Sequence, residues 1–246
     1  LSYEGLSDRL KTKKFVVQSS KSHTGSGTWI ITSEEDIQKR KALHGGLPCR
    51  ITEYVDGNTY TLNIAHYNKK TFYGPIQYQI PGIAELGSKF ATTLGNDFSF
   101  AKRYFPKTSL ENLINELEKI KQVLNRIHFK GLCGIDFIVK DGEIFLIELN
   151  ARRTANIPFQ TYIERKHGLI PQALIDLYYQ LGGKETLVYN NLALLNGGQL
   201  FLRANQDLDI FNSDISSGVI RIEKSEETFH TQELMSFQDL DKNEVL

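Results

Sequence analysis

The fold is decided by two apolar runs and the turn between them: Gly134-Ile135-Asp136-Phe137-Ile138-Val139, Asp141-Gly142, and Ile144-Phe145-Leu146-Ile147-Glu148-Leu149-Asn150. Both runs are rich in β-branched and aromatic residues, which favour strands, and an Asp-Gly pair is typical of a hairpin turn. We therefore expect an antiparallel hairpin with strands at 133–139 and 143–149.

Three polar side chains interrupt these strands: Asp136, Glu148 and Asn150. Side chains two apart in a strand share a face, and antiparallel pairing brings Asp136 to the end of the hairpin that carries the other two. Facing carboxylates are costly unless a cation or a shared proton offsets their repulsion, and hard oxygen ligands suit Mg²⁺ or Mn²⁺. We expect a metal site here. The residues alone leave open a hairpin end whose carboxylates are solvated or paired with nearby arginines.

Two arginines, Arg152 and Arg153, directly follow this group. Cations beside an acidic metal site make sense where an anion, such as a polyphosphate, bridges the metal and the guanidinium groups. We therefore expect both arginines to take part in catalysis by binding an anion of the reaction.

The chain ahead of this hairpin has a ββαββ pattern. We expect strands at 14–18, 28–31, 50–55 and 58–66, and a helix that is opened by Ser33 and ended by Gly45-Gly46. The loop between the first two strands contains Thr24, Gly25, Ser26 and Gly27. Its backbone N–H groups could enclose phosphates, because glycine lets the backbone approach an anion. An ordinary turn is the alternative, and the Gly-Lys-Ser/Thr of a Walker A motif is absent.

The rest of the chain continues the mixed pattern. Apolar residues spaced by three and four follow a capping box at Thr108 to Glu111 and predict a long helix, and Gly95-Asn96-Asp97 predicts a polar loop. Helices at 159–166 and 171–181 and a β-leaning tail from 186 onward complete the prediction. We divide the chain into a lid at 1–67, a core with the metal site at 68–184 and a C-terminal extension at 185–246.

Over residues 13–180 the chain resembles the ATP-grasp superfamily. The resemblance rests on Thr24-Gly25-Ser26-Gly27, on Ile51-Thr52-Glu53-Tyr54-Val55-Asp56-Gly57, and above all on Gly134-Ile135-Asp136-Phe137 with Glu148-Leu149-Asn150-Ala151-Arg152. It implies an α+β ATP-grasp fold, in which two α+β lobes, a ββαββ lid and an antiparallel-sheet core, sandwich the nucleotide. It also implies ATP and Mg²⁺ as cofactors, with Asp136, Glu148 and Asn150 on the metal ions.

The same resemblance implies further roles. The backbone of Glu53-Tyr54-Val55 would hydrogen-bond adenine, and Arg152 would contact oxygens of the substrate or of an acyl phosphate. Two positions depart from the family pattern: Gln18 stands where a phosphate-binding lysine is usual, and Thr59 where a ribose-binding acid is usual. An amide can still donate a hydrogen bond to phosphate, but it adds no charge.

Composition narrows the classes of function. The 246 residues are 40% hydrophobic and 24% charged, which is enough for a globular core. A net charge of +0 argues against a nucleic-acid partner, and no apolar run reaches the roughly 18 residues of a membrane span. With only two cysteines, we expect a cytoplasmic protein, which could form a homo-oligomer. Because it starts at Leu1 and its only methionine is Met235, we expect the chain to be part of something longer. The resembling family usually has an N-terminal domain with a further phosphate-binding lysine, and the stretch ahead of Lys14 is too short to contain it.

These observations predict an ATP- and Mg²⁺-dependent ligase that activates a carboxylate as an acyl phosphate for attack by an amine, similar to amino-acid or peptide ligases. A non-catalytic nucleotide-binding module is the first alternative, because Gln18 replaces the usual lysine. A metal-dependent nuclease is the second, because Asp136 with Glu148-x-Asn150 approximates Asp and Glu-x-Lys on a hairpin. The net charge of +0 and Asn150 in place of lysine argue against the nuclease.

Overall fold

The computed structural model describes residues 13–19, 27–44, 48–82, 92–185, 187 and 192–200, and the backbone of three short strands beyond residue 218. The chain divides into two compact units, Leu1–Arg203 and Ala204–Leu246. The predicted loop residues Thr24, Gly25 and Ser26 lie outside the described residues.

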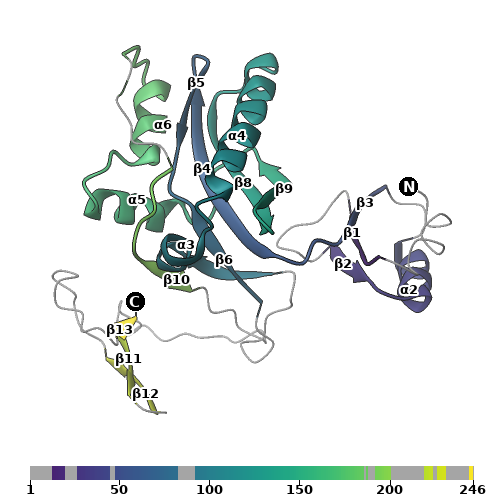
Figure 1. Cartoon of the computed structure of the whole chain (residues 1–246). Helices are drawn as coiled ribbons and strands as arrows, with labels where there is room; N and C mark the ends of the chain where they lie inside the picture. Colours follow the sequence, from purple (N-terminus) through teal and green to yellow (C-terminus); the bar gives the residue numbers. More distant parts are fainter. Residues whose placement is uncertain are drawn as a thin grey trace. The chain divides into compact units, whose positions relative to one another are not determined.

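The first strands of the chain form a small antiparallel sheet in the order β2-β1-β3, beside helix α2 (Figure 1). Its elements are β1 (Phe15–Ser19), β2 (Thr28–Ile31), α2 (Glu34–His44) and β3 (Cys49–Glu53). Alternate residues of the strands point to α2, so that Phe15, Val17, Ile31 and Ile37 make a buried cluster. The predicted helix start is confirmed, because the Asp36 N–H donates to Ser33 Oγ at 3.2 Å.

A larger sheet has the strand order β10-β7-β6-β4-β8-β9, with β5 paired to β4 (Figure 1). Its strands are β4 (Asn58–Tyr67), β5 (Lys70–Tyr73), β6 (Gln77–Pro81), β7 (Thr93–Asp97), β8 (Gly131–Lys140), β9 (Glu143–Asn150) and β10 (Gly198–Leu200). The expectation that the strand at 58–66 completes a ββαββ lid is wrong. β4 pairs with β8 along nearly its whole length, from Asn58 opposite Val139 to His66 opposite Gly131. The domain limits at 67 and 184 stay a prediction.

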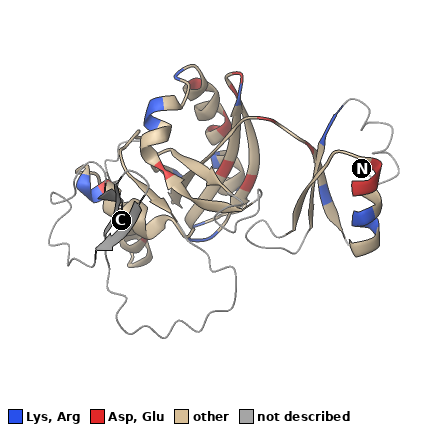
Figure 2. Ribbon diagram, turned by 90° about the horizontal axis from the view of Figure 1, so that it is seen from below, with Lys and Arg blue, Asp and Glu red and all other residues tan. Residues whose placement is uncertain are grey.

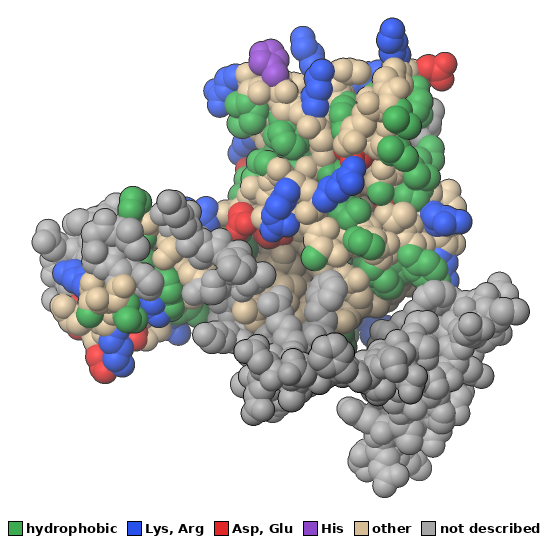
Figure 3. All heavy atoms as spheres, turned by 180° about the vertical axis from the view of Figure 1, so that it is seen from behind, with side chains coloured by type: hydrophobic (Ala, Val, Ile, Leu, Met, Phe, Trp, Pro, Cys, Tyr) green, Lys and Arg blue, Asp and Glu red, His purple; other side chains and the backbone are tan. Residues whose placement is uncertain are grey.

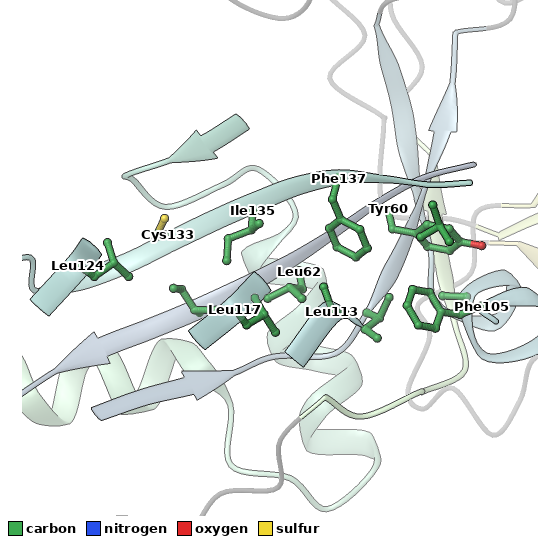
Figure 4. Packing of buried hydrophobic residues seen from close by; sticks show 13 residues of the cluster. Tyr60, Leu62, Phe105, Leu113, Leu117, Leu124, Cys133, Ile135 and Phe137 are labelled. Carbon is green, nitrogen blue, oxygen red and sulfur yellow. The ribbon is translucent and has the colours of Figure 1, made fainter. Parts of the chain in front are cut away.

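Helices cover the larger sheet: α3 (Phe98–Tyr104), α4 (Ser109–Arg126), α5 (Ile157–Lys166) and α6 (Gln172–Gln180). One face of the sheet packs on α4 through a buried apolar cluster that includes Leu62, Leu113, Leu117, Ile135 and Phe137 (Figure 4). Because large side chains from three elements are fully buried there, this cluster fixes the hairpin β8-β9 against the rest of the sheet.

Two local predictions are wrong. Gly95, Asn96 and Asp97 were expected in a loop, but they end strand β7, which pairs with β6 on one side and β10 on the other. The Asp97 side chain then accepts from the Phe100 N–H at 2.8 Å and starts helix α3, which the sequence did not predict. Helix α4 does begin after Thr108, but without a side-chain cap, so the capping box is not formed.

The second unit contains strands β11 (Val219–Glu223), β12 (Glu226–His230) and β13 (Glu244–Val245), in the order β12-β11-β13. The β-leaning tail is therefore confirmed for these segments. Acidic and basic residues both occur along the described helices and strands (Figure 2), as the balanced net charge predicts. Among the described residues, no helix has the length and apolar character that crossing a membrane requires.

Candidate functional site

The candidate site lies on the hairpin β8-β9. From the turn, pairing is regular, with Lys140 opposite Glu143 and Phe137 opposite Leu146. The register then shifts by one residue, so that Ile147 is the extra residue of a β-bulge and Glu148 lies opposite Asp136. Directly opposed residues in an antiparallel pair share a face. The bulge therefore brings the two predicted metal carboxylates together.

Asp136 is the partly buried centre of this site. Its Oδ1 accepts a hydrogen bond from Gln79 Nε2 at 2.8 Å, and its Oδ2 accepts one from Asn150 Nδ2 at 3.1 Å. Burial raises the pKa of Asp136 to about 6, with a further upward contribution from Glu148 and opposing ones from the hydrogen bonds of Thr61 and Asn150. A positive charge nearby would stabilise the ionised form of this buried carboxyl group.

Asn150 connects the carboxylates to Arg152. While its Nδ2 donates to Asp136, its Oδ1 accepts from Arg152 NH2 at 3.2 Å. The Arg152 N–H also donates to the Asn150 carbonyl at 2.7 Å, which folds the chain tightly after β9. The side chains of Arg152, Asn150 and Asp136 thus form a continuous polar chain next to Glu148.

Arg153 points to a different partner. Its NH2 donates to Asp176 Oδ2 on α6 at 2.7 Å, and no hydrogen bond joins it to the Asp136–Glu148 pair within the described part of the chain. The structure therefore brings Asp136, Glu148, Asn150 and Arg152 together, whereas the side chain of Arg153 hydrogen-bonds Asp176.

A buried polar network fixes the segment that carries both arginines. Thr154 Oγ1 donates to Asn63 Oδ1 at 2.7 Å, and Asn63 Nδ2 donates to Asn156 Oδ1 at 3.1 Å and to Gln160 Oε1 at 2.7 Å. Buried amides without partners would be costly, so these bonds specify one position for the segment. Gly134 makes the close approach possible, because a Cβ there would lie 2.5 Å from Thr154 Cγ2.

In the small sheet, Gln18 is held by its neighbours. Its Oε1 accepts from Arg50 Nε at 2.9 Å and Arg50 NH2 at 2.5 Å, and its Nε2 lies 3.4 Å from Thr28 Oγ1. The amide that stands in place of a lysine is therefore directly beside an arginine charge. The sequence analysis missed Arg50, although its position opposite Gln18 on the next strand could have been proposed from the pairing.

Three other predicted nucleotide-binding residues, Gly27, Glu53 and Tyr54, lie in or next to the same sheet. The Gly27 carbonyl accepts from the Ser19 N–H at 2.9 Å, where β1 ends and β2 begins. At the other end, Glu53 pairs with Lys13 at 2.8 Å, and the Tyr54 N–H donates to the Lys14 carbonyl at 2.9 Å.

These contacts restrict how the linker at residues 54–57 could bind a base. The Tyr54 N–H is already used, whereas the Val55 N–H makes no backbone hydrogen bond with the described residues. The Val55 N–H is therefore available to a purine edge, and the Asp56 and Gly57 N–H groups likewise make no backbone hydrogen bond with the described residues.

The donor set at the hairpin fits a divalent metal that is shared with phosphates. No group of three or more His, Cys, Asp and Glu side chains capable of holding a metal occurs in the part of the chain that the structure describes. The hairpin instead supplies two carboxylates and one amide. Mg²⁺ commonly uses one or two protein carboxylates together with substrate phosphates and water. Burial is the main cause of the raised pKa of Asp136, Glu148 raises the pKa further, and the Arg152 charge opposes the shift.

Sequence reasoning missed Gln79 and Asp176. Gln79 alternates with the buried Gln77 along β6, a period of two that marks a shared face, but nothing in the sequence shows that β6 lies near Asp136. Nothing in the sequence distinguishes Asp176 from other polar residues of a helix, and only the packing of α6 shows that it is buried.

Comparison with known proteins identifies the family of the chain and its fold. A family model, the ATP-grasp domain, matches residues 4–156. The carbamoyl phosphate synthase large chain of Caldanaerobacter subterraneus subsp. tengcongensis is 28% identical over 117 residues, which are 47% of this chain and 10% of that one.

Two solved structures share the fold. The phosphoribosylamine–glycine ligase of Thermotoga maritima aligns with a TM-score of 0.57 at 19% identity, over 80% of this chain and 51% of that one. N5-carboxyaminoimidazole synthetase from Staphylococcus aureus, complexed with ADP, aligns with a TM-score of 0.55 at 14% identity, over 81% of this chain and 48% of that one. The chain thus spans about half of these structures and about a tenth of the synthase.

An α+β fold with opposed carboxylates at the end of a hairpin is the architecture expected from the resemblance. The chain belongs to the ATP-grasp family, because the family model covers more than half of it. The predicted family and fold class are therefore confirmed.

Proposed function

We propose that the chain is the ATP-grasp part of an ATP- and Mg²⁺-dependent ligase that joins a carboxylate to an amine. The observation that carries the proposal is the Asp136–Glu148 pair, with Asn150 and Arg152 in a hydrogen-bonded chain beside it. One structure with the same fold is named a phosphoribosylamine–glycine ligase, and another was solved with ADP. These names support a nucleotide-dependent ligase and do not identify the substrates.

The metal proposal rests on the ligands at the hairpin. Asp136, Glu148 and Asn150 would hold Mg²⁺, and Mn²⁺ has similar preferences for oxygen ligands. When bound, the metal would supply the positive charge that offsets the charge of the ATP phosphates during transfer. In the structure, Glu148 makes no hydrogen bond or ion pair with the other described side chains, so its oxygens are available to a cation.

In the proposed reaction, an oxygen of the substrate carboxylate attacks the γ-phosphorus of ATP, the bond to the β-phosphate oxygen breaks, and ADP leaves. The amine then attacks the acyl phosphate and releases phosphate. Arg152 would bind an oxygen of the carboxylate with its planar fork, because Asn150 holds the guanidinium at the edge of the metal site.

The small sheet would bind the rest of the nucleotide. The loop with Thr24, Gly25, Ser26 and Gly27 would cover the phosphates, and Gln18 with Arg50 would donate hydrogen bonds to them. The linker Glu53-Tyr54-Val55 would contact adenine, through the Val55 N–H. Closure of such a lid would exclude water, which would otherwise hydrolyse an acyl phosphate.

The test is to incubate the full chain with Mg-ATP, a panel of carboxylic acids and hydroxylamine, which converts an acyl phosphate to a hydroxamate. Acid-dependent release of ADP together with hydroxamate supports the ligase. ATP binding without acid-dependent turnover would contradict it and support a non-catalytic nucleotide-binding module. Cytoplasmic location, the absence of nucleic-acid and membrane partners, and a homo-oligomeric state stay predictions.

A further inference from the structure

Arg152 and Arg153 are neighbours in sequence, but their guanidinium groups hydrogen-bond different side chains. Arg152 turns to the metal site, where its NH2 donates to Asn150 Oδ1 at 3.2 Å. Arg153 turns to α6, where its NH2 donates to Asp176 Oδ2 at 2.7 Å. The loop after β9 therefore carries two guanidinium groups, one hydrogen-bonded to Asn150 and the other to Asp176.

The support of Arg153 is rigid. Asp176 is 1% exposed, and its Oδ1 accepts from the Tyr67 hydroxyl at 2.5 Å, while its Oδ2 also accepts from Gln180 Nε2 at 3.0 Å. Burial and the Asp176 carboxylate raise the pKa of Tyr67 to about 12, so the hydroxyl remains a proton donor. Two donors besides Arg153, Tyr67 on β4 and Gln180 on α6, thus fix the orientation of this carboxylate.

Arg153 itself is largely exposed, with 63% of its side chain accessible to solvent. Only its NH2 bonds to a described side chain, so the remaining donors of the fork are available at the surface. If Arg153 only neutralised the buried Asp176 carboxylate, its one hydrogen bond to Asp176 would be enough. That role alone does not account for the position of its other N–H donors, which lie at the surface beside Arg152. An arginine held by a buried acid is instead preorganised to bind an anion in one orientation.

Lys and Arg side chains and hydrophobic side chains both occur on the face of the molecule that Figure 3 shows. We propose that Arg153, positioned by Asp176, binds a second acidic group of the carboxylate substrate. The substrate would then be a dicarboxylic acid or an acidic amino acid, with the reacting carboxylate at Arg152 and the other at Arg153. The inference rests on the proposed ligase function and deepens it by naming the substrate class.

The experiment compares acids of equal length with one and two carboxylates. The full chain is given Mg-ATP, hydroxylamine and either succinate or butyrate, and kcat/KM for hydroxamate formation is measured. We expect succinate to be preferred by at least about tenfold, the usual size of one charge-assisted hydrogen bond. Arg153→Gln should remove this preference by lowering kcat/KM for succinate by about tenfold, a larger loss than for butyrate. Arg165→Gln, which removes an exposed arginine of α5, is the matched control and should preserve the preference.

Asp176→Asn tests the positioning role. The substitution removes the charge that positions Arg153, so it should weaken binding of the second carboxylate of succinate. KM for succinate should therefore rise, while kcat and the KM for butyrate stay the same. Equal effects of Arg153→Gln on both acids, or no preference in the wild type, would overturn the proposal.

Failure of the ligase proposal has its own signature, namely no hydroxamate with any acid. The anion site is then decided by binding alone, with succinate and butyrate titrated into the Mg-ADP complex and followed by NMR. Saturable binding of succinate that Arg153→Gln removes would support the site, and equal binding of the two acids would overturn it.

Discussion

Asp136 and Glu148 lie directly opposite each other, although the turn that joins their strands would not place them so. Counting from the pair Lys140 and Glu143, a regular ladder puts Ile147 opposite Asp136 and turns Glu148 to the other face. The bulge at Ile147 adds one unpaired residue to β9, so that Glu148 lies opposite Asp136. Bulges change the direction of side chains near active sites in other folds as well.

The first prediction concerns the metal site. Glu148→Gln should lower acid-dependent ADP release by on the order of a thousandfold, because it would remove a charged ligand of the proposed metal ion, which would stabilise phosphoryl transfer. The fold should survive, since Glu148 is exposed. Glu143→Gln, at the other end of the same strand, is the control and should retain activity. Unchanged Mg²⁺-dependent turnover in the Glu148 variant would refute the site.

The second prediction tests the bulge. Glu148→Ile should abolish turnover, and adding Ile147→Glu should not restore it, because position 147 is the extra residue and does not face Asp136. The pair of substitutions keeps the composition of the strand, so circular dichroism and thermal unfolding serve as checks on folding. Recovery of turnover in the double variant would mean that the hairpin is regular in solution.

The sequence predicts this hairpin better than it predicts the site. Alternating and β-branched residues marked both strands, and the shared parity of Asp136 and Glu148 suggested one face. That reasoning was incomplete. With a two-residue turn and regular pairing, an even-numbered residue on one strand lies opposite an odd-numbered residue on the other, and only the bulge brings the even-numbered Asp136 and Glu148 opposite each other. Nothing distinguishes Ile147 from an ordinary strand residue, so the bulge could not be located in advance.

Tertiary pairing explains the other differences. Gly95, Asn96 and Asp97 are turn formers by local preference, but strands on both sides supply their hydrogen-bond partners. Asp176 lies on the short helix α6 and becomes buried beside Tyr67 and Arg153 only because α6 packs against β4. Such relations depend on contacts between elements distant in sequence, which local patterns do not encode.

The third prediction concerns the small sheet and pH. The Asp36 carboxylate accepts from the Thr32 N–H at 2.9 Å and from the Ser33 N–H at 3.0 Å, and the hydrogen bond from the Thr32 backbone is the main cause of its lowered pKa. A lowered folded-state pKa contributes stability above the unfolded value of about 4, and this stability is lost as pH falls through the folded value.

Asp36→Asn should therefore destabilise the protein at neutral pH, and the difference from the wild type should shrink in acid. Chemical unfolding between pH 7 and about 3 measures it. Glu34→Gln removes a neighbouring charge of the same helix without removing these hydrogen bonds and is the control. A difference between wild type and Asp36→Asn that does not change with pH would show that the cap does not depend on the charge.

The fourth prediction concerns the close packing under the arginine loop. A Cβ at Gly134 would lie 2.5 Å from Thr154 Cγ2 and 3.2 Å from Asn63 Oδ1. Gly134→Ala should therefore displace the loop, destabilise the protein by about 1–3 kcal/mol, and lower turnover, because Arg152 moves with Thr154. Thermal unfolding and the hydroxamate assay measure both effects. Gly198→Ala, where the nearest atom to a new Cβ is 3.6 Å away, is the matched control and should be tolerated.

Thr154→Ser provides the decisive companion variant, because serine keeps the hydroxyl that donates to Asn63 and lacks the methyl group in the way. Alone it should have little effect. Combined with Gly134→Ala it should recover part of the lost stability and turnover, with the remainder owed to the tight contact at Asn63 Oδ1. If the double variant is as impaired as the sum of the single variants, Gly134 acts through the strand backbone and not through the loop that carries Arg152.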